Sequence, residues 1–181
     1  ITAIALFSLS VFHYYTAGFG LLREVTHRAV HMAFVLALIF LVFSARRDDR
    51  TLYASSLWRP AGIPLLDWAF AAAAVVSTLY VPYVFSDLAF RVGNPLTIDV
   101  VMGTLLIVVL LEATRRSMGW PLPVIAILII AYGLFGRHAP GVLVHPGASW
   151  STMVNHLYLT SQGIYGLPVG VVATYVFHFV L

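Results

Sequence analysis

Charged residues in this chain are few and far apart, and the long apolar segments between them constrain the fold most strongly. Uncharged windows run over 1–22, 29–45, 68–86, 100–111 and 117–136, and again after Arg137. A charged side chain at the centre of a bilayer costs at least ~2.5–3.5 kcal/mol on insertion scales, whereas about 20 apolar residues cross the hydrocarbon core as one helix. The windows therefore predict an integral membrane protein.

The composition argues against a soluble protein. Hydrophobic residues make up 61% of the chain and charged residues 9%, against roughly 45–50% and about a quarter in soluble domains. All 10 basic residues are arginines, and there is no cysteine, so disulfides and thiolate metal sites are excluded. Because the arginines lie between apolar windows, we expect them to set membrane orientation and not to bind nucleic acid.

The windows predict an all-α membrane protein with about six transmembrane helices. We expect helices at about 1–20, 28–45, 65–87, 96–114 and 119–136, with a sixth beginning near 166. Most prolines near these helices lie close to a predicted start, where a missing backbone N–H costs little. Pro82 lies inside the third helix and predicts a kink there.

Arginine counts predict the orientation of these helices. One side carries Arg46, Arg47, Arg50, Arg59, Arg115 and Arg116, and the other carries Arg23, Arg28, Arg91 and Arg137. Cytoplasmic loops are enriched in basic residues, so we expect residue 1 inside the cell and segment 137–165 outside.

Segment 137–165 contains one amphipathic stretch. Its apolar residues recur at the spacing of one helix face, namely Trp150, Met153, Val154, Leu157 and Tyr158. Ser149 is a predicted N-cap and Gly163 a predicted stop. We expect a helix over 149–160 that lies flat at the outer membrane interface, with the five apolar residues as its anchor.

Glu112, Arg115 and Arg116 are the strongest candidates for a structural site. Their spacing places the carboxylate beside both guanidinium groups on one helix face, at the cytoplasmic end of the fourth helix. We expect a membrane-edge anchor worth ~0.3–0.5 kcal/mol if the pairs are exposed; a docking point for another domain is the alternative. Asp67 and Asp99 each follow a predicted helix start, where the helix dipole favours an acid. Contact with a moving cation is the less favoured interpretation of both acids.

The histidines allow a second interpretation. His27 and His31 have a spacing that suits zinc, but no third ligand is nearby. His13 and His31 are expected at similar depth on adjacent helices, as a haem with two histidine ligands requires. No phosphate-binding loop, dinucleotide-binding glycine set, catalytic triad or catalytic carboxylate pair is found in the sequence. We therefore predict no catalytic residues, no metal site and no enzymatic activity.

Three stretches resemble one known family. They are 12–20 (FHYYTAGFG), 111–121 (LEATRRSMGWP) and 155–181 (NHLYLTSQGIYGLPVGVVATYVFHFVL). They are similar to the fused membrane subunit of tripartite ATP-independent periplasmic (TRAP) transporters, in the branch served by TAXI-type binding proteins. The similarity extends over essentially the whole chain.

The resemblance implies a domain plan and a function. Residues 1–118 would form the four-helix small domain, 119–136 a linking helix, and 137–181 the truncated start of the large transport domain. The protein would be the scaffold part of a sodium-coupled permease in a bacterial or archaeal inner membrane, importing organic acids delivered by a periplasmic TAXI-type protein. The sodium and substrate sites would lie beyond Leu181, so the chain would be an N-terminal fragment with no transport ligands and no cofactor. The alternative is a haem- or quinone-binding redox subunit using His13 and His31.

Overall fold

The computed structural model describes residues 2–20, 22–43 and 63–180, and within these ranges it is all-α, as the sequence predicts. Its long helices are α1 (Thr2–Phe19), α2 (Glu24–Val42), α3 (Leu65–Tyr83), α5 (Thr97–Met118) and α6 (Pro121–Phe135). The arginines at 46, 47, 50 and 59 lie outside the described residues, so the predicted orientation stays a prediction.

Four helices in the described part of the chain are long and apolar enough to cross a membrane, and they indicate a multi-pass membrane protein. They are Glu24–Val42, Leu65–Tyr83, Thr97–Met118 and Pro121–His138. The predicted first span is present as helix α1 but is not among these four, and the predicted last span corresponds to a shorter apolar helix over Leu167–Val176. Four of the six predicted spans are therefore present as helices long and apolar enough to cross a membrane.

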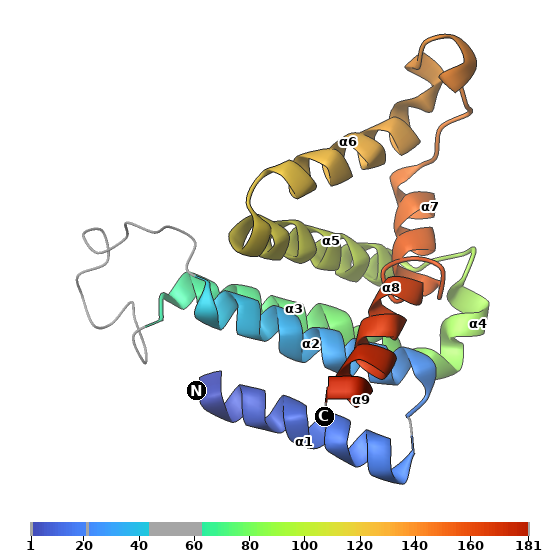
Figure 1. Cartoon of the computed structure of the whole chain (residues 1–181). Coiled ribbons are helices and arrows are strands. Elements are labelled where there is room, and N and C mark those ends of the chain that lie inside the picture. Colours follow the sequence, from blue (N-terminus) through green and yellow to red (C-terminus); the bar gives the residue numbers. More distant parts are fainter. Residues whose placement is uncertain (1, 21, 44–62, 181) are drawn as a thin grey trace, which may run out of the picture.

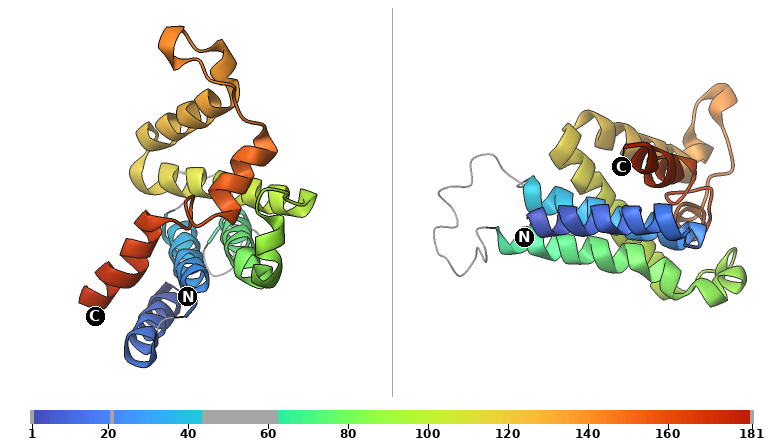
Figure 2. Two further views of the ribbon diagram at one scale, coloured as in Figure 1. Left: turned by 90° about the vertical axis from the view of Figure 1, so that its right-hand side faces the viewer. Right: turned by 60° about the horizontal axis from the view of Figure 1, so that its bottom comes forward.

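The long helices form a bundle that opens on one side. The antiparallel helices α2 and α3 run side by side, α1 lies along α2, and α5 packs against α3 and α2 (Figures 1 and 2). Ala71 and Ala74 of α3 are buried in the core with Ala29 and Phe40 of α2, because small side chains let two helix backbones approach closely. After α5, the chain reverses at Gly119, whose φ of 89° suits glycine. Helix α6 then diverges from α5 and contributes little to the core (Figure 1).

Pro82 ends a helix and does not kink it. The sequence predicts a third helix that continues to 87, but α3 stops at Tyr83, and Pro82 lies in its last turn. A 3-10 turn, η3 (Phe85–Asp87), and the short helix α4 (Leu88–Arg91) follow. The proline ring excludes the backbone carbonyl of the preceding turn and supplies no N–H, so the helix is easily terminated at this point.

The predicted helix over 149–160 is present in two parts. After the 3-10 turns η4 (Gly136–His138) and η5 (Gly141–Leu143), α7 (Trp150–Val154) continues as the π-helix η6 (Asn155–Leu159). Ser149 is its N-cap, because its Oγ accepts the Thr152 N–H at 3.2 Å. Gly163 lies in the following turn, where a side chain would meet the carbonyl oxygen of Leu157. The Ser149 prediction is confirmed, whereas the helix ends at Leu159, before the predicted stop at Gly163.

The apolar face of this helix packs on protein, which corrects the predicted lipid anchor. Val154 and Tyr158 are 1% and 0% exposed and fill the space left by the missing side chain of Gly103 in α5. The Tyr158 hydroxyl donates to the carbonyl oxygen of Ser77 at 2.5 Å. An apolar face gains as much from a protein groove as from lipid, and Gly103 provides such a groove.

The other three residues of the predicted anchor are partly buried. The Trp150 indole N–H donates to Thr104 Oγ1 at 2.9 Å, Met153 lies against Gly133 of α6, and Leu157 packs on the core. The segment therefore packs against both α5 and α6. None of its five apolar residues is fully exposed.

The chain then returns to the bundle as a last helix. This helix comprises α8 (Leu167–Gly170), the π-helical η7 (Val171–Val176) and α9 (Phe177–Val180), and it lies against α2 and α1 (Figure 2). The Arg28 guanidinium occupies the space that a side chain at Gly170 would fill. Arg28 also donates to the carbonyl oxygen of Tyr165 at 2.7 Å.

Candidate functional site

Two clusters of charged side chains link α3, or the segment that follows it, to α5. One cluster lies at each end of this helix pair. The 67/116 cluster comprises Asp67, Glu112, Arg115 and Arg116. The 91/99 cluster comprises Tyr80, Asp87, Arg91 and Asp99. A third polar group, the histidine cluster, comprises His13, His27 and His31 between α1, α2 and the last helix.

Arg116 is the centre of the 67/116 cluster. Its side chain is 1% exposed, and it donates to Asp67 Oδ1 at 2.6 Å and to Glu112 Oε1 at 2.7 Å. The guanidinium also lies over the rings of Phe40 and Phe70, 4.8 and 5.2 Å from their centroids. Two carboxylates and two aromatic faces thus replace the water that this cation has lost.

Arg115 completes the cluster on its outer side. It donates to both oxygens of Glu112 at 2.7 Å, with the two side chains 25% and 20% exposed. The predicted pairing of Glu112 with both arginines is confirmed, but Arg116 is buried and also binds Asp67 on α3. Asp67 does not cap α3 with its side chain; Arg116 is its partner, which the sequence did not predict. The cluster therefore binds one helix to another.

Asp99 is the centre of the 91/99 cluster and is 0% exposed. Its carboxylate accepts hydrogen bonds from the Leu96 N–H at 2.8 Å, the Tyr80 hydroxyl at 2.6 Å and Arg91 Nη1 at 3.0 Å. The first of these is the favourable position at a helix start that the sequence predicted. Arg91 also binds Asp87 at 3.2 Å; burial lowers the pKa of Arg91, but the bonds to Asp87 and Asp99 raise it overall.

Sequence reasoning missed Tyr80 and Arg91 as partners of Asp99. The available signal was Asp99 itself, an acid in an apolar region. Arg91 is a lone arginine in the connection eight residues before it. The two residues belong to different elements, so no helix periodicity links them and the sequence did not single out Arg91.

The histidine cluster is buried where three helices meet. His13, His27 and His31 are 0%, 2% and 4% exposed. His13 Nε2 lies 2.9 Å from His31 Nδ1, and the His13 ring stacks on Phe177 at 4.3 Å between centroids. His27 Nε2 lies 3.0 Å from the carbonyl oxygen of Ala173; since a carbonyl only accepts, this nitrogen carries the hydrogen. The predicted proximity of His13 and His31 is confirmed.

The histidine geometry does not suit the haem alternative. A haem ligated by His13 and His31 would lie between their coordinating nitrogens, and a 2.9 Å contact leaves no space for the macrocycle. Within residues 2–20, 22–43 and 63–180, no three histidine or acidic side chains converge on a position for a metal ion.

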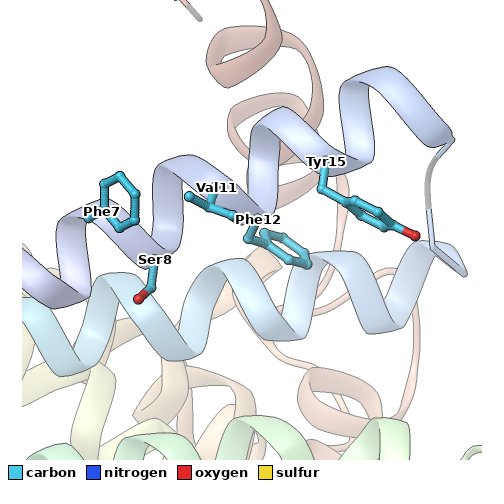
Figure 3. A pocket seen from close by; sticks show the side chains of 5 residues that line it. All are labelled: Phe7, Ser8, Val11, Phe12 and Tyr15. Carbon is cyan, nitrogen blue, oxygen red and sulfur yellow. The ribbon is translucent and has the colours of Figure 1, made fainter.

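A shallow hollow on α1 carries no recognisable chemistry. It measures about 370 Å³ and is lined by Phe7, Ser8, Val11, Phe12 and Tyr15 (Figure 3). All five residues come from α1, and none of them is an acid, a histidine or an arginine. The ring of Phe12 stacks on His27 of α2 with centroids 5.3 Å apart, whereas Phe7, Val11 and Tyr15 are exposed.

Comparisons with known proteins add no relative. No protein-family model matches the chain, and neither a curated protein nor a solved structure matches it.

Proposed function

We propose that this chain is the scaffold portion of a sodium-coupled permease of the TRAP type, which imports organic acids delivered by a periplasmic TAXI-type binding protein. The resemblance of stretches 12–20, 111–121 and 155–181 to that family supports the proposal. Four apolar helices long enough to cross a membrane are the framework that such a scaffold needs. In this proposal the protein lies in the inner membrane, is not an enzyme and needs no cofactor for its scaffold role.

One observation carries the scaffold role. Every carboxylate in the described part of the chain is paired with an arginine. Glu24 pairs with Arg28, Asp67 with Arg116, Asp87 and Asp99 with Arg91, and Glu112 with Arg115 and Arg116. A cation in transit requires acidic groups that are able to exchange partners. Carboxylates held by guanidinium groups suit a rigid support better than an ion path.

The sodium dependence of uptake tests this role. The assay uses the intact transporter that contains residues 1–181, reconstituted in vesicles with its binding protein. If the chain is a scaffold, Asp99→Asn lowers the amount of assembled protein but leaves the sodium concentration for half-maximal uptake unchanged per molecule. The matched control is Asp87→Asn, which changes the more exposed partner of the same arginine. A several-fold shift in the sodium requirement with Asp99→Asn would place this residue on the ion path and refute the proposal.

A second measurement uses residues 1–181 alone. We expect vesicles that contain only this segment, with the binding protein added, to show no sodium-dependent uptake of organic acids. The intact transporter serves as the positive control, and a helical circular dichroism spectrum confirms that the segment is folded. Uptake by the segment would mean that transport ligands lie within it.

A further inference from the structure

A groove in the helix bundle combines mostly apolar walls with one histidine. It measures about 340 Å³ and lies between α2, α5 and the last helix. Residues that define its course are His31, Leu36, Ile39, Thr114, Ser117 and Val172. Most of the remaining lining is aliphatic, so the groove suits a molecule that dissolves in the membrane.

His31 is the polar feature of the groove. The residue is 4% exposed, and its Nδ1 is engaged by His13. Its Nε2 receives no hydrogen bond from any described residue, and the His31 side chain lines the groove. A polar atom without a partner is unfavourable in apolar surroundings. The nitrogen is therefore available to a ligand with a hydrogen-bonding group at this end of the groove.

The other polar residues of the groove do not offer such contacts. Thr114 Oγ1 donates to the carbonyl oxygen of Leu110 at 2.8 Å, and Ser117 Oγ donates to that of Ala113 at 2.9 Å. Both hydroxyl hydrogens are thus used by the backbone of α5. Away from His31, the groove is suited to an apolar tail.

Depth in the membrane distinguishes between classes of ligand. His31 follows Glu24, the first residue of α2, by seven positions, which places it ~10 Å along the helix from its end. The polar atoms of a phospholipid lie at the membrane surface, so its acyl chain alone would reach this depth. From His31 to Ile39 the groove extends ~12 Å along α2. This length fits a tail of several carbon atoms beyond a head group at His31.

We propose that the groove binds a lipophilic quinone, with a ring oxygen hydrogen-bonded to His31 Nε2 and the tail directed toward Ser117. A neutral imidazole has one donor and one acceptor nitrogen. When His13 donates to His31 Nδ1, His31 Nε2 donates to a quinone carbonyl. In the opposite tautomer, the same nitrogen accepts from a quinol hydroxyl. The contact between His13 and His31 therefore allows binding of either the quinone or the quinol. The inference concerns binding and includes no redox step.

Photolabelling tests the assignment in lipid nanodiscs that contain the intact protein. An azidoquinone probe is cross-linked, and the labelled peptides are mapped by mass spectrometry, with decylquinone and decylbenzene as competitors. We expect label in segments lining the groove and competition by decylquinone only. His31→Phe keeps the ring and removes the nitrogens, and loss of one hydrogen bond predicts roughly 2- to 13-fold weaker competition. His138→Phe, on an exposed histidine remote from the groove lining, is the control and should match the wild type.

A second variant keeps the test decisive if His31→Phe fails to fold. Val172→Trp narrows the groove from the last helix and leaves His31 in place, so labelling should also fall. The inference is overturned if decylbenzene competes as well as decylquinone. It is equally overturned if folded His31→Phe labels like the wild type, or if a phospholipid with an azido group on its acyl chain displaces the quinone. The last result would identify the groove as an ordinary lipid contact.

Discussion

The two ends of the α3–α5 pair hold the same kind of contact but form it from different elements. In the 67/116 cluster, Arg116 and Asp67 both belong to long helices, and their side chains are 1% and 2% exposed. In the 91/99 cluster, Arg91 comes from the short helix α4 and is 17% exposed, whereas Asp99 is fully buried. At one end a cation is buried between helices, and at the other a connecting segment covers a buried acid.

The difference lies in how many partners remain when the arginine is removed. Within the described residues, Asp67 has no hydrogen-bonded side-chain partner other than Arg116. Asp99 also accepts from the Tyr80 hydroxyl and from the Leu96 N–H. Since a buried charge is costly mainly when it loses its last partner, the two ends should respond unequally to matched substitutions.

The largest effect should come from Arg116→Ala. It leaves Asp67 buried without its guanidinium, and we expect a loss of about 3–5 kcal/mol in the free energy of unfolding. Detergent titration of the purified protein measures this quantity. The double variant Arg116→Met with Asp67→Asn should recover much of the loss, because no buried charge then remains unpaired. If the double variant is as unstable as Arg116→Ala, the loss comes from packing and not from charge.

Arg91→Ala should have a smaller effect, about 1.5–3 kcal/mol by the same titration. Asp99 loses a charged donor but keeps two others, so the expected loss is that of a hydrogen bond to a charged group. Adding Tyr80→Phe should increase the loss more than Tyr80→Phe does in the wild type, because Asp99 then depends on one donor. An Arg91→Ala loss equal to that of Arg116→Ala would remove the distinction between the two ends.

Glu112→Ala should cost about 1 kcal/mol. The exposed pairs predicted from sequence are worth ~0.3–0.5 kcal/mol, but Glu112 also holds the buried Arg116. Arg116 keeps Asp67 in this variant, which limits the loss. Thermal unfolding of the detergent-solubilised protein, with Arg115→Ala as control, separates the two contributions. A loss of several kcal/mol would show that Glu112, and not Asp67, is the main partner of Arg116.

Asp87→Ala should have the smallest effect, below ~0.5 kcal/mol. Its side chain is 60% exposed, and its pair with Arg91 is an i, i+4 contact on the surface. Thermal unfolding at low and at high salt should give nearly the same stability loss for Asp87→Ala, because the loss is small in both conditions. A loss comparable to that of Arg91→Ala would mean that Asp87 positions the arginine over Asp99.

Some of this organisation follows from sequence alone. Uncharged windows predict where long apolar helices lie, because a charged side chain is costly inside a bilayer and this cost can be read from residue type. Local spacing likewise determines the contact of Glu112 with Arg115 and Arg116, since residues three and four apart share a helix face. Ser149 and Asp99 were predictable at helix starts for the same reason.

The tertiary structure alone decided which faces and charges meet. Arg116 and Asp67 are 49 positions apart, and no local rule joins them. The stripe from Trp150 to Tyr158 determined a helix but not its environment, because an apolar face packs equally well on lipid and on protein. Gly103 decided that outcome by leaving space on α5. Spacing along the chain thus determined the elements, whereas the complementarity of distant surfaces decided how they pack.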